Sequence, residues 1–408
     1  MGIMSWIGRT FGLRDPQPWA EYYGGRSKAG QTVTVDTALQ LSTVWACVWL
    51  ISRTVATLPL GVYERKADGS RVSVPRHPLA MLLRNPNADF TPTEFWEAET
   101  QSLLLWGNSF SERLGRDEVP SSLMRLDPHR LMVSRDDMNR MRFEYHERDG
   151  RTRKLSEKQV FIIRGQYMGG DLGVSAIKYG CNSMGAALAA EEAASQLFEN
   201  GLHSNGFVKI PQLIKDKTQR EQFIENWIKP IQGAKNAGKI GVLEAGMEWV
   251  EATVKAVDAE LLASRRNSVE DICRWFGVPP IMIGHAAQGQ TMWGSGVEQI
   301  NLAFLIHGIR PWLKRIEGAI NKRLVPTNER GRLYVEFNVE GLLQADSAGR
   351  AEMYSKLFQI GAITPNQIAD KENYPRFDGG DQRFVNSTYV PIELAGQKNA
   401  PPAPEAEE

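Results

Sequence analysis

Apolar residues recur every three or four positions in several long stretches of the chain, and this spacing predicts helices. The stretches cover residues 35–58, 92–106, 174–199, 258–276 and 297–324. Leu58-Pro59 ends the first stretch, because proline cannot continue a helix. Pro311 lies inside the last stretch, where its ring would clash with the carbonyl group of His307, so we expect a helix kink at Pro311.

Short runs rich in β-branched and aromatic residues separate these helices and predict strands. They cover residues 60–65, 143–146, 160–163 and 333–337. Capping boxes at Thr91–Glu94 and Thr364–Gln367 mark the starts of two helices, each with proline at the first helical position. The predicted fold class is therefore α+β, with a mixed α/β region over about the first 170 residues.

Two segments interrupt the helical pattern. Residues 203–255 form a compact insert of strands, among them one predicted at 239–243, with one short helix and a loop rich in glycine and lysine. Residues 284–296 read GHAAQGQTMWGSG, with four glycines and no formal charge. A loop of this length without secondary structure of its own is usually functional or disordered. Residues 284–296 can therefore be interpreted either as a functional loop or as a flexible linker.

The charges of the chain balance, but they are unevenly distributed. Its 408 residues include 48 Lys and Arg against 48 Asp and Glu, which argues against a polybasic protein that holds nucleic acid by charge. Residues 203–243 and 297–332 each hold seven basic and three acidic residues, a net charge of +4. Residues 244–262 and 341–408 each carry a net charge of −4. In a ring of subunits, such segments would stack into bands of alternating sign.

The residue types that carry most enzyme chemistry do not form recognisable motifs. Cys47, Cys181 and Cys273 lie far apart, and no Cys/His spacing suits a metal ion. The six histidines form no HExxH pair, and no serine lies in a GxSxG turn. We therefore expect no catalytic residue, no metal and no cofactor, and the chain is not predicted to be an enzyme.

One segment, Gly233 to Lys239, matches the first seven positions of a phosphate-binding P-loop. The eighth position is Ile240, where a P-loop has the Ser or Thr that binds magnesium. The segment also follows a predicted helix, whereas a P-loop follows a strand. A basic surface turn is the better interpretation, and a P-loop-like NTPase or a DNA-binding module remain the alternatives.

The ends of the chain and its apolar runs bear on its location. The longest apolar run, residues 41–51, is too short to span a membrane, and the N-terminus has no signal-peptide pattern. Expression in the cytoplasm is therefore expected. Residues 396–408, which end in PPAPEAEE, have the composition of a disordered tail.

Several segments, in this order and spacing, resemble the portal (head–tail connector) proteins of tailed double-stranded-DNA bacteriophages, in the compact branch typical of siphophages. They are LSTVWACVWLISRTVATLPLGVYER, HPLAMLLRNPN, LLLWGNSF, ALAAEEAASQLFENG, RRNSVEDICRWFGVPPIMIG, VEQINLAFLIHGIRPWLKRIEGAINKRL, GAITPNQIADKENYP and FDGGD. No single segment decides the resemblance, but together they extend over most of the chain.

The resemblance implies a domain organisation. It consists of an N-terminal arm at 1–34, a wing at 35–173, a stem helix at 174–202, a clip at 203–255, a second stem helix at 256–283, a tunnel loop at 284–296, a long wing helix and wing strand at 297–340, a crown at 341–395 and the tail at 396–408. It also implies that the chain assembles as a ring of 12 subunits through which double-stranded DNA passes.

The resemblance further implies partners, a location and site residues. The clip would meet the terminase large subunit during genome packaging and the head–tail adaptor protein afterwards, through Lys229, Lys235 and Lys239. Major capsid and scaffold proteins would be further partners, at the portal vertex of the virion and in the host cytoplasm during assembly. The residues expected to line the DNA channel are Gln288, Gly289, Gln290, Thr291, Met292 and Trp293.

Overall fold

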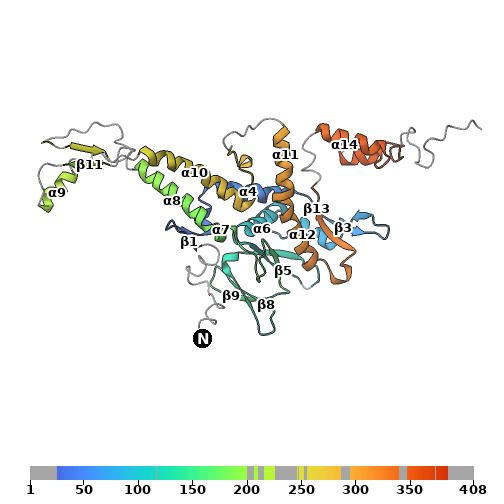
Figure 1. Cartoon of the computed structure of the whole chain (residues 1–408). Helices are drawn as coiled ribbons and strands as arrows, with labels where there is room; N and C mark the ends of the chain where they lie inside the picture. The colour runs from blue at the N-terminus through green and yellow to red at the C-terminus, as the bar shows by residue number, and fades with distance from the viewer. Residues whose placement is uncertain are drawn as a thin grey trace, which may run out of the picture. The chain divides into compact units, whose positions relative to one another are not determined.

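A computed structural model shows that the chain forms two compact units, residues 1–338 and 339–408, and each is described by itself. The structure, shown in Figure 1, describes residues 25–115, 117–199, 206–209, 216–225, 246, 248–251, 255–285, 295–339, 347–372 and 374–384. Its helices and small antiparallel sheets confirm the predicted α+β class.

Helices α4 (Ser42–Thr57) and α6 (Pro92–Trp106) pack against each other in the first unit. Val44, Ile51 and Val55 on one side of α4 are completely buried. The predicted capping box at the start of α6 is confirmed, because the Thr91 hydroxyl accepts from the Glu94 N–H and the Glu94 carboxylate accepts from the Thr91 N–H. The short helix α5 (Pro78–Arg84) lies between them in sequence.

The prediction of one continuous helix over 35–58 is wrong. The structure has a short helix α3 (Val35–Ala38), and α4 begins only at Ser42. Leu41 between them adopts an extended backbone and is only 2% exposed. Leu41 therefore precedes α4 as its N-cap residue, and helical periodicity does not register such a buried residue in extended geometry.

Three small antiparallel sheets lie beside this helical layer (Figure 1). In the first, β5 (Asn108–Leu114) lies between β10 (Val160–Arg164) and β6 (Ser122–Leu126). The second is a meander of β7 (Leu131–Arg135), β8 (Met141–His146) and β9 (Thr152–Ser156). In the third, β3 (Leu60–Arg65) lies between β4 (Arg71–Ser73) and β13 (Leu333–Phe337). A two-stranded pair, β1 (Gly25–Arg26) and β2 (Thr32–Val33), precedes them.

The first two sheets share one hydrophobic core. Its buried members are Phe110, Leu126, Leu131, Met141, Phe143, Leu155, Val160 and Ile162. The rings of Phe110 and Phe143 meet edge to face with their centroids 6.1 Å apart. Because the cluster draws on strands from residue 110 to residue 162, it joins the two sheets into one body.

Gly107 connects α6 to β5 in a conformation that requires glycine. Its φ of 76° is left-handed, and it ends α6 as the sequence predicts. A Cβ at this position would lie 2.4 Å from the carbonyl carbon of Val174. The turn therefore also brings the segment before α7 against the sheet.

The predicted helix over 174–199 is divided. The structure has α7 (Ala176–Tyr179) and α8 (Cys181–Glu199), separated by Gly180. A Cβ at Gly180 would lie 3.2 Å from the indole of Trp275. The predicted helix at 258–276 is confirmed as α10 (Lys255–Phe276), which begins three residues earlier than expected.

Short elements occupy the described part of the insert. β11 (Gly206–Lys209) pairs antiparallel with β12 (Glu248–Glu251), and α9 is Lys217–Phe223. The predicted strand at 239–243 lies outside the described residues.

The last helical stretch of the first unit contains three segments. They are α11 (Ser295–Ala303), a π-helical segment η6 (Phe304–Ile309) and α12 (Arg310–Arg323), which packs on β10 and β13. The short 3₁₀ turns η1 (Pro128–Arg130), η5 (Pro280–Ile283) and η7 (Thr327–Glu329) connect other elements.

The second unit contains α14 (Ser347–Gln359) and α15 (Pro365–Lys371). The capping box predicted at Thr364 is confirmed, because its hydroxyl accepts from the Gln367 N–H at 3.2 Å. The buried Asn366 side chain fixes the chain after α15, since it bonds both the N–H and the carbonyl group of Phe377 at 3.1 Å.

Candidate functional site

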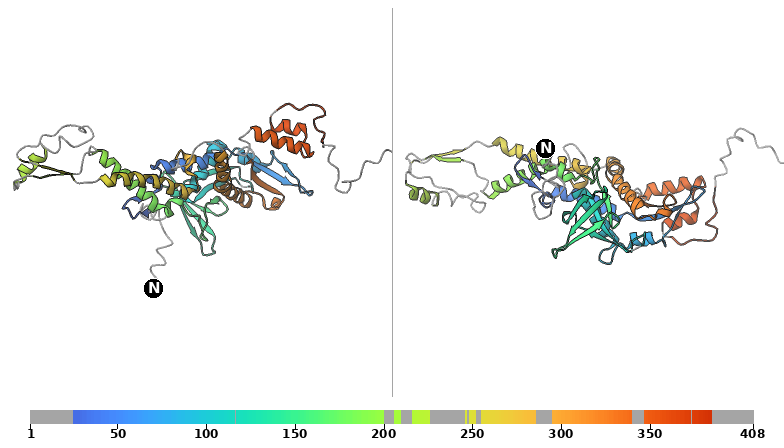
Figure 2. Two further views of the ribbon diagram at one scale, coloured as in Figure 1. Left: turned by 45° about the horizontal axis from the view of Figure 1, so that its top comes forward. Right: turned by 90° about the horizontal axis from the view of Figure 1, so that it is seen from below.

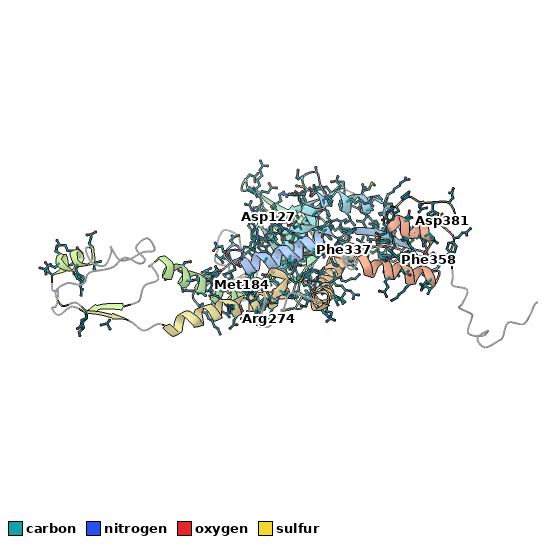
Figure 3. All side chains as sticks on the ribbon, turned by 90° about the horizontal axis from the view of Figure 1, so that it is seen from above. Asp127, Met184, Arg274, Phe337, Phe358 and Asp381 are labelled. Carbon is teal, nitrogen blue, oxygen red and sulfur yellow. The ribbon has the colours of Figure 1, made fainter. Side chains whose placement is uncertain are left out.

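The alanine-rich helix α8 and the helix α10 run side by side, as Figure 2 shows from two directions. The Trp275 indole near the end of α10 donates to the Ser183 hydroxyl at the start of α8 at 3.1 Å, so the helices are antiparallel. Figure 3 labels Met184 and Arg274 on these neighbouring helices. Ala187 and Ala194 are buried, and such small side chains allow two helices to approach closely.

The end of α10 is anchored on α4 through buried contacts. Cys47 and Cys273 are both completely buried, with their Sγ atoms 3.9 Å apart. The hydrogen bond between the two thiols and their burial raise the pKa of Cys47, so it stays a neutral thiol. Ile272 and Phe276 complete the anchor. Cys47 and Cys273, which lie far apart in sequence, therefore meet in the fold as a packing contact.

After α10, the chain reaches the predicted channel loop through η5. Val278 is buried, and Gly284 ends η5 with a φ of 79°. The six residues from Gln288 to Trp293 that we expect to line the channel lie outside the described residues, and the chain is described again from Ser295. Lys229, Lys235 and Lys239 of the predicted clip also lie outside the described residues.

Pro311 lies in the first turn of α12, directly after the π-helical segment. Proline has no N–H, so it cannot bond to the carbonyl group of His307, and the wider π turns occur just before it. Gly308 in this segment lies close to the end of α10, because a Cβ there would be 3.1 Å from the carbonyl oxygen of Gly277. The π-helical segment, which leads into α12, therefore packs against the residue that follows α10.

Several large apolar side chains on these helices face outward. Trp275 is 39% exposed, Leu302 46% and Ile306 41%. On α4, Trp45 is 51% exposed and its ring contacts that of Trp49 at a tilted angle of 58°, with the centroids 5.2 Å apart. The Arg53 guanidinium lies 4.4 Å from the centre of the Trp49 ring. Trp45, Trp49 and Arg53 follow i, i+4 spacing, a signal that sequence analysis could have used.

A buried carboxyl group, which sequence analysis missed, lies between α6 and β5. Glu99 is completely buried and accepts hydrogen bonds from the hydroxyl groups of Ser109 and Ser111, the latter at 2.7 Å. Burial raises the pKa of Glu99 to about 7, and the positive charge of Arg125 opposes this increase. Glu99 therefore forms buried hydrogen bonds between α6 and β5, and its carboxyl group is not accessible to solvent.

The described residues contain no cluster of three or more side chains that could hold a metal ion. Within the same residues, no helix combines the length and the apolar character that a membrane crossing requires.

Comparison with known proteins places these elements in a family. A model of the phage portal protein family matches residues 42–373. The portal protein of Enterobacteria phage HK97 is 36% identical over 374 residues, which cover 91% of this chain and 87% of that protein.

Two solved structures share the fold. A crystal structure of an HK97 family phage portal protein from Corynebacterium diphtheriae has a TM-score of 0.57 at 17% identity, covering 78% of this chain and 99% of that one. A chain in the neck of a native gene transfer agent particle, computed with C12 symmetry, has a TM-score of 0.54 at 23% identity, covering 88% of this chain and 98% of that one. The family match extends from α4 to the end of α15, and the chain belongs to the phage portal protein family.

Proposed function

We propose that copies of this chain assemble as a closed ring of 12 subunits that forms the DNA channel at one vertex of the capsid. The observation that carries the ring is the group of outward-facing apolar side chains on α10, α11 and η6, namely Trp275, Leu302 and Ile306. A ring repeats one heterologous interface, which would cover such a surface on every subunit. The C12 symmetry of the gene transfer agent neck supports the number 12.

Each part of the chain takes a separate task in this ring. Residues 35–173 and 297–340 form the wing, which would meet capsid and scaffold proteins, and residues 341–395 form the crown. The stem helices at 174–202 and 256–283, which include α8 and α10, lead to the clip. The clip at 203–255 receives the terminase large subunit and later the head–tail adaptor, with Lys229, Lys235 and Lys239 as contact residues.

Residues 284–296 would form the loop that touches the passing duplex. Each phosphate that a Lys or Arg neutralises adds affinity, and a translocating duplex must not be held tightly. The loop carries no formal charge, so Gln288, Gln290 and Trp293 would contact the DNA backbone without trapping it. The ring therefore acts as a conduit without a catalytic step of its own.

Electron microscopy of the purified chain tests the ring directly. We expect closed rings, and a protein that stays monomeric under every assembly condition would contradict the proposal.

Deletion of residues 288–293 tests the loop. The deletion should leave ring formation intact and impair DNA packaging or retention in an assembly reaction. Normal packaging by rings of the deletion variant would show that the loop has no part in the proposed function. Reversal of charge at Lys229, Lys235 and Lys239 is the matched test of the clip, because it should weaken terminase binding without affecting the ring.

A further inference from the structure

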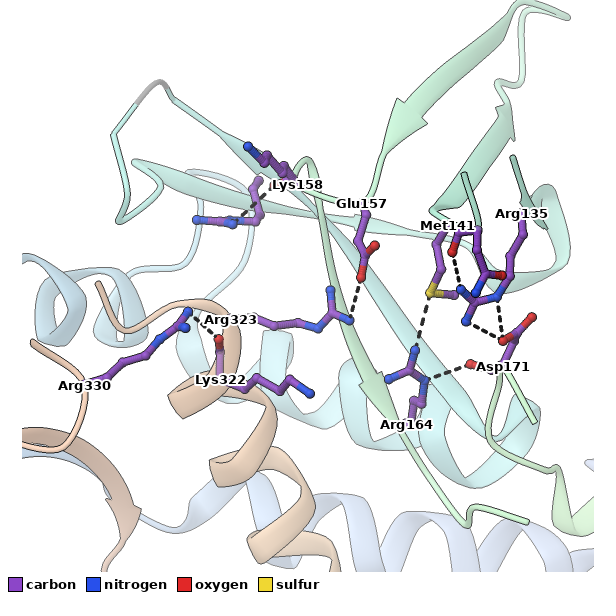
Figure 4. A network of polar contacts seen from close by, with 11 residues as sticks. Arg135, Met141, Glu157, Lys158, Arg164, Asp171, Lys322, Arg323 and Arg330 are labelled. Atoms are coloured by element: carbon purple, nitrogen blue, oxygen red, sulfur yellow. Dashed lines mark hydrogen bonds and ion pairs between the residues drawn. The ribbon is translucent and has the colours of Figure 1, made fainter. Parts of the chain in front are cut away.

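A cavity of about 420 Å³ at the C-terminal end of α12 is lined mainly by basic side chains. Arg113 comes from β5, Lys158 from the turn between β9 and β10, Lys322 and Arg323 from the last turn of α12, and Arg330 from the segment after η7. Figure 4 shows Arg323 reaching from α12 toward Glu157, the acidic residue that lines the cavity. Residues far apart in sequence thus create one basic site.

The carboxylates near the cavity do not balance these charges. Arg140 and Arg142, which also line it, share the single carboxylate of Asp136, each at 3.0 Å. Glu157 lies 3.5 Å from Arg323, which is long for an ion pair with a strong hydrogen bond. The two carboxylates of Asp136 and Glu157 therefore do not neutralise all the basic side chains that line the cavity.

The other arginines bond to uncharged oxygen atoms. Arg113 donates to the backbone carbonyl groups of Lys158 at 3.2 Å and Glu118 at 2.6 Å, and Arg330 donates to that of Lys322 at 2.8 Å. A carbonyl group satisfies a donor without cancelling its charge. No residue that the structure describes forms an ion pair with the ammonium groups of Lys158 or Lys322.

Arg323 is held in this position against its electrostatic preference. Its side chain is only 16% exposed. Burial and the nearby positive charges of Arg164 and Arg113 lower the pKa of Arg323. Burial also lowers the pKa of Arg113. An anion that enters the cavity would relieve this repulsion, so it would gain more here than beside an isolated surface lysine.

The lining of the cavity, in which Arg323 is largely buried and Lys158 and Lys322 are exposed, indicates the kind of anion. Duplex DNA is stiff, with a persistence length of about 50 nm, so it would meet the exposed lysines more readily than the largely buried Arg323. A glutamate on an extended peptide can enter, because its side chain stands away from the backbone. Its planar carboxylate also matches the two-pronged geometry of guanidinium groups such as that of Arg323.

We propose that this basic cavity binds an acidic, glutamate-rich segment of a partner protein. The recessed Arg323 and Arg113 would receive one carboxylate, while Lys158 and Lys322 at the rim would pair with its neighbours. The cavity lies in the segments assigned to the wing, apart from the channel loop, the clip and the exposed helical side chains that carry the ring, so this interaction can hold or fail independently of them.

Fluorescence anisotropy of the full chain with a labelled peptide of alternating glutamate and serine tests the proposal. At low ionic strength, where charges are weakly screened, we expect the peptide to bind and the same peptide with glutamine in place of glutamate not to bind. The double variant Lys158→Gln/Lys322→Gln removes two exposed cations and should weaken binding roughly tenfold or more, with a further loss on adding Arg323→Gln.

Arg151→Gln is the matched control. It removes one positive charge from the β8–β9 turn, where Arg151 is exposed and pairs with Asp149 at 3.4 Å outside the cavity. It should leave peptide binding unchanged. Circular dichroism shows whether the variants remain folded. If Arg323→Gln does not fold, the double variant of the two exposed lysines alone tests the proposal.

Carbodiimide cross-linking locates the bound peptide, because it joins a lysine ammonium group to a carboxylate in contact with it. Mass spectrometry should find the peptide glutamates joined to Lys158 or Lys322. Absence of binding, equal binding of the glutamine peptide, or cross-links only to other lysines would overturn the proposal. Displacement of the peptide from these lysines by a DNA duplex would also overturn it, since the occupant would then be nucleic acid.

Discussion

The sheet core and the helices from α10 to η6 differ in how much of their large apolar side chains is exposed to solvent. Phe110, Phe143 and their neighbours are at most 5% exposed. Trp275, Leu302 and Ile306 on the helices are 39% to 46% exposed, although buried residues such as Phe276 and Phe304 lie beside them. One region completes its burial within a single chain, whereas the other leaves large apolar side chains exposed on the surface of that chain.

Truncation of the sheet core should have the largest effect on stability. Phe143→Ala removes a completely buried ring and leaves a cavity between two sheets, so we expect the free energy of unfolding to fall by about 3–5 kcal/mol. Urea unfolding followed by circular dichroism measures it. Met138→Ala, at a side chain that is 74% exposed, is the control. A loss for Phe143→Ala as small as that of the control would mean that the core is not closed.

The buried carboxyl group of Glu99 tests whether this body excludes water. Between pH of about 4.5 and about 7, an unfolded chain ionises Glu99 while the folded chain keeps it neutral, because burial raises the pKa of Glu99 to about 7. The free energy of unfolding of the wild type therefore falls as pH rises through this window.

Glu99→Gln removes this dependence. The stability of the variant relative to the wild type should increase by about 3 kcal/mol from pH 4.5 to pH 7.5. Unfolding curves of both proteins at each pH provide the measurement. A difference that stays constant with pH would show that Glu99 titrates normally in the folded chain.

Loss of a helix cap in the same body should have a smaller effect. Thr91→Ala removes the hydroxyl that accepts from the Glu94 N–H, and we expect a loss of about 1 kcal/mol in the free energy of unfolding. Thr91→Ser keeps the hydroxyl and should cost much less. Equal losses for the two variants would argue that the cap does not stabilise α6.

The exposed helical surface should contribute least to the stability of one subunit. Leu302→Gln/Ile306→Gln should change the free energy of unfolding of the monomer by no more than about 0.5 kcal/mol, because these side chains already face solvent. Urea unfolding at a concentration that keeps the chain monomeric gives the value. A loss as large as that for Phe143→Ala would make these residues part of the core and erase the contrast between the regions.

Local signals in the sequence predicted much of the fold. The capping boxes at Thr91 and Thr364 and the glycine at 107 place helix ends where the structure has them. The strand at 333–337 is also correct, although the sequence does not show that it pairs with β3. These features depend on residues close together in the chain.

Features that depend on distant residues could not be predicted in this way. The helices are interrupted at Leu41, which is buried, and at Gly180, which lies against the Trp275 indole, and periodicity reveals neither environment. The net charge of residues 297–332 gave a hint of the basic cavity, but its other walls come from β5, β8 and the β9–β10 turn. The family came from the order of several segments, and the channel and clip residues remain predictions.

Native mass spectrometry of the wild type beside Leu302→Gln/Ile306→Gln, at equal subunit concentration, tests most directly whether the exposed helical surface is the ring interface. The wild type should appear as a closed assembly of 12 subunits, and the variant as folded monomers. A variant that assembles as well as the wild type, or a wild type that remains monomeric, would contradict this account of the surface.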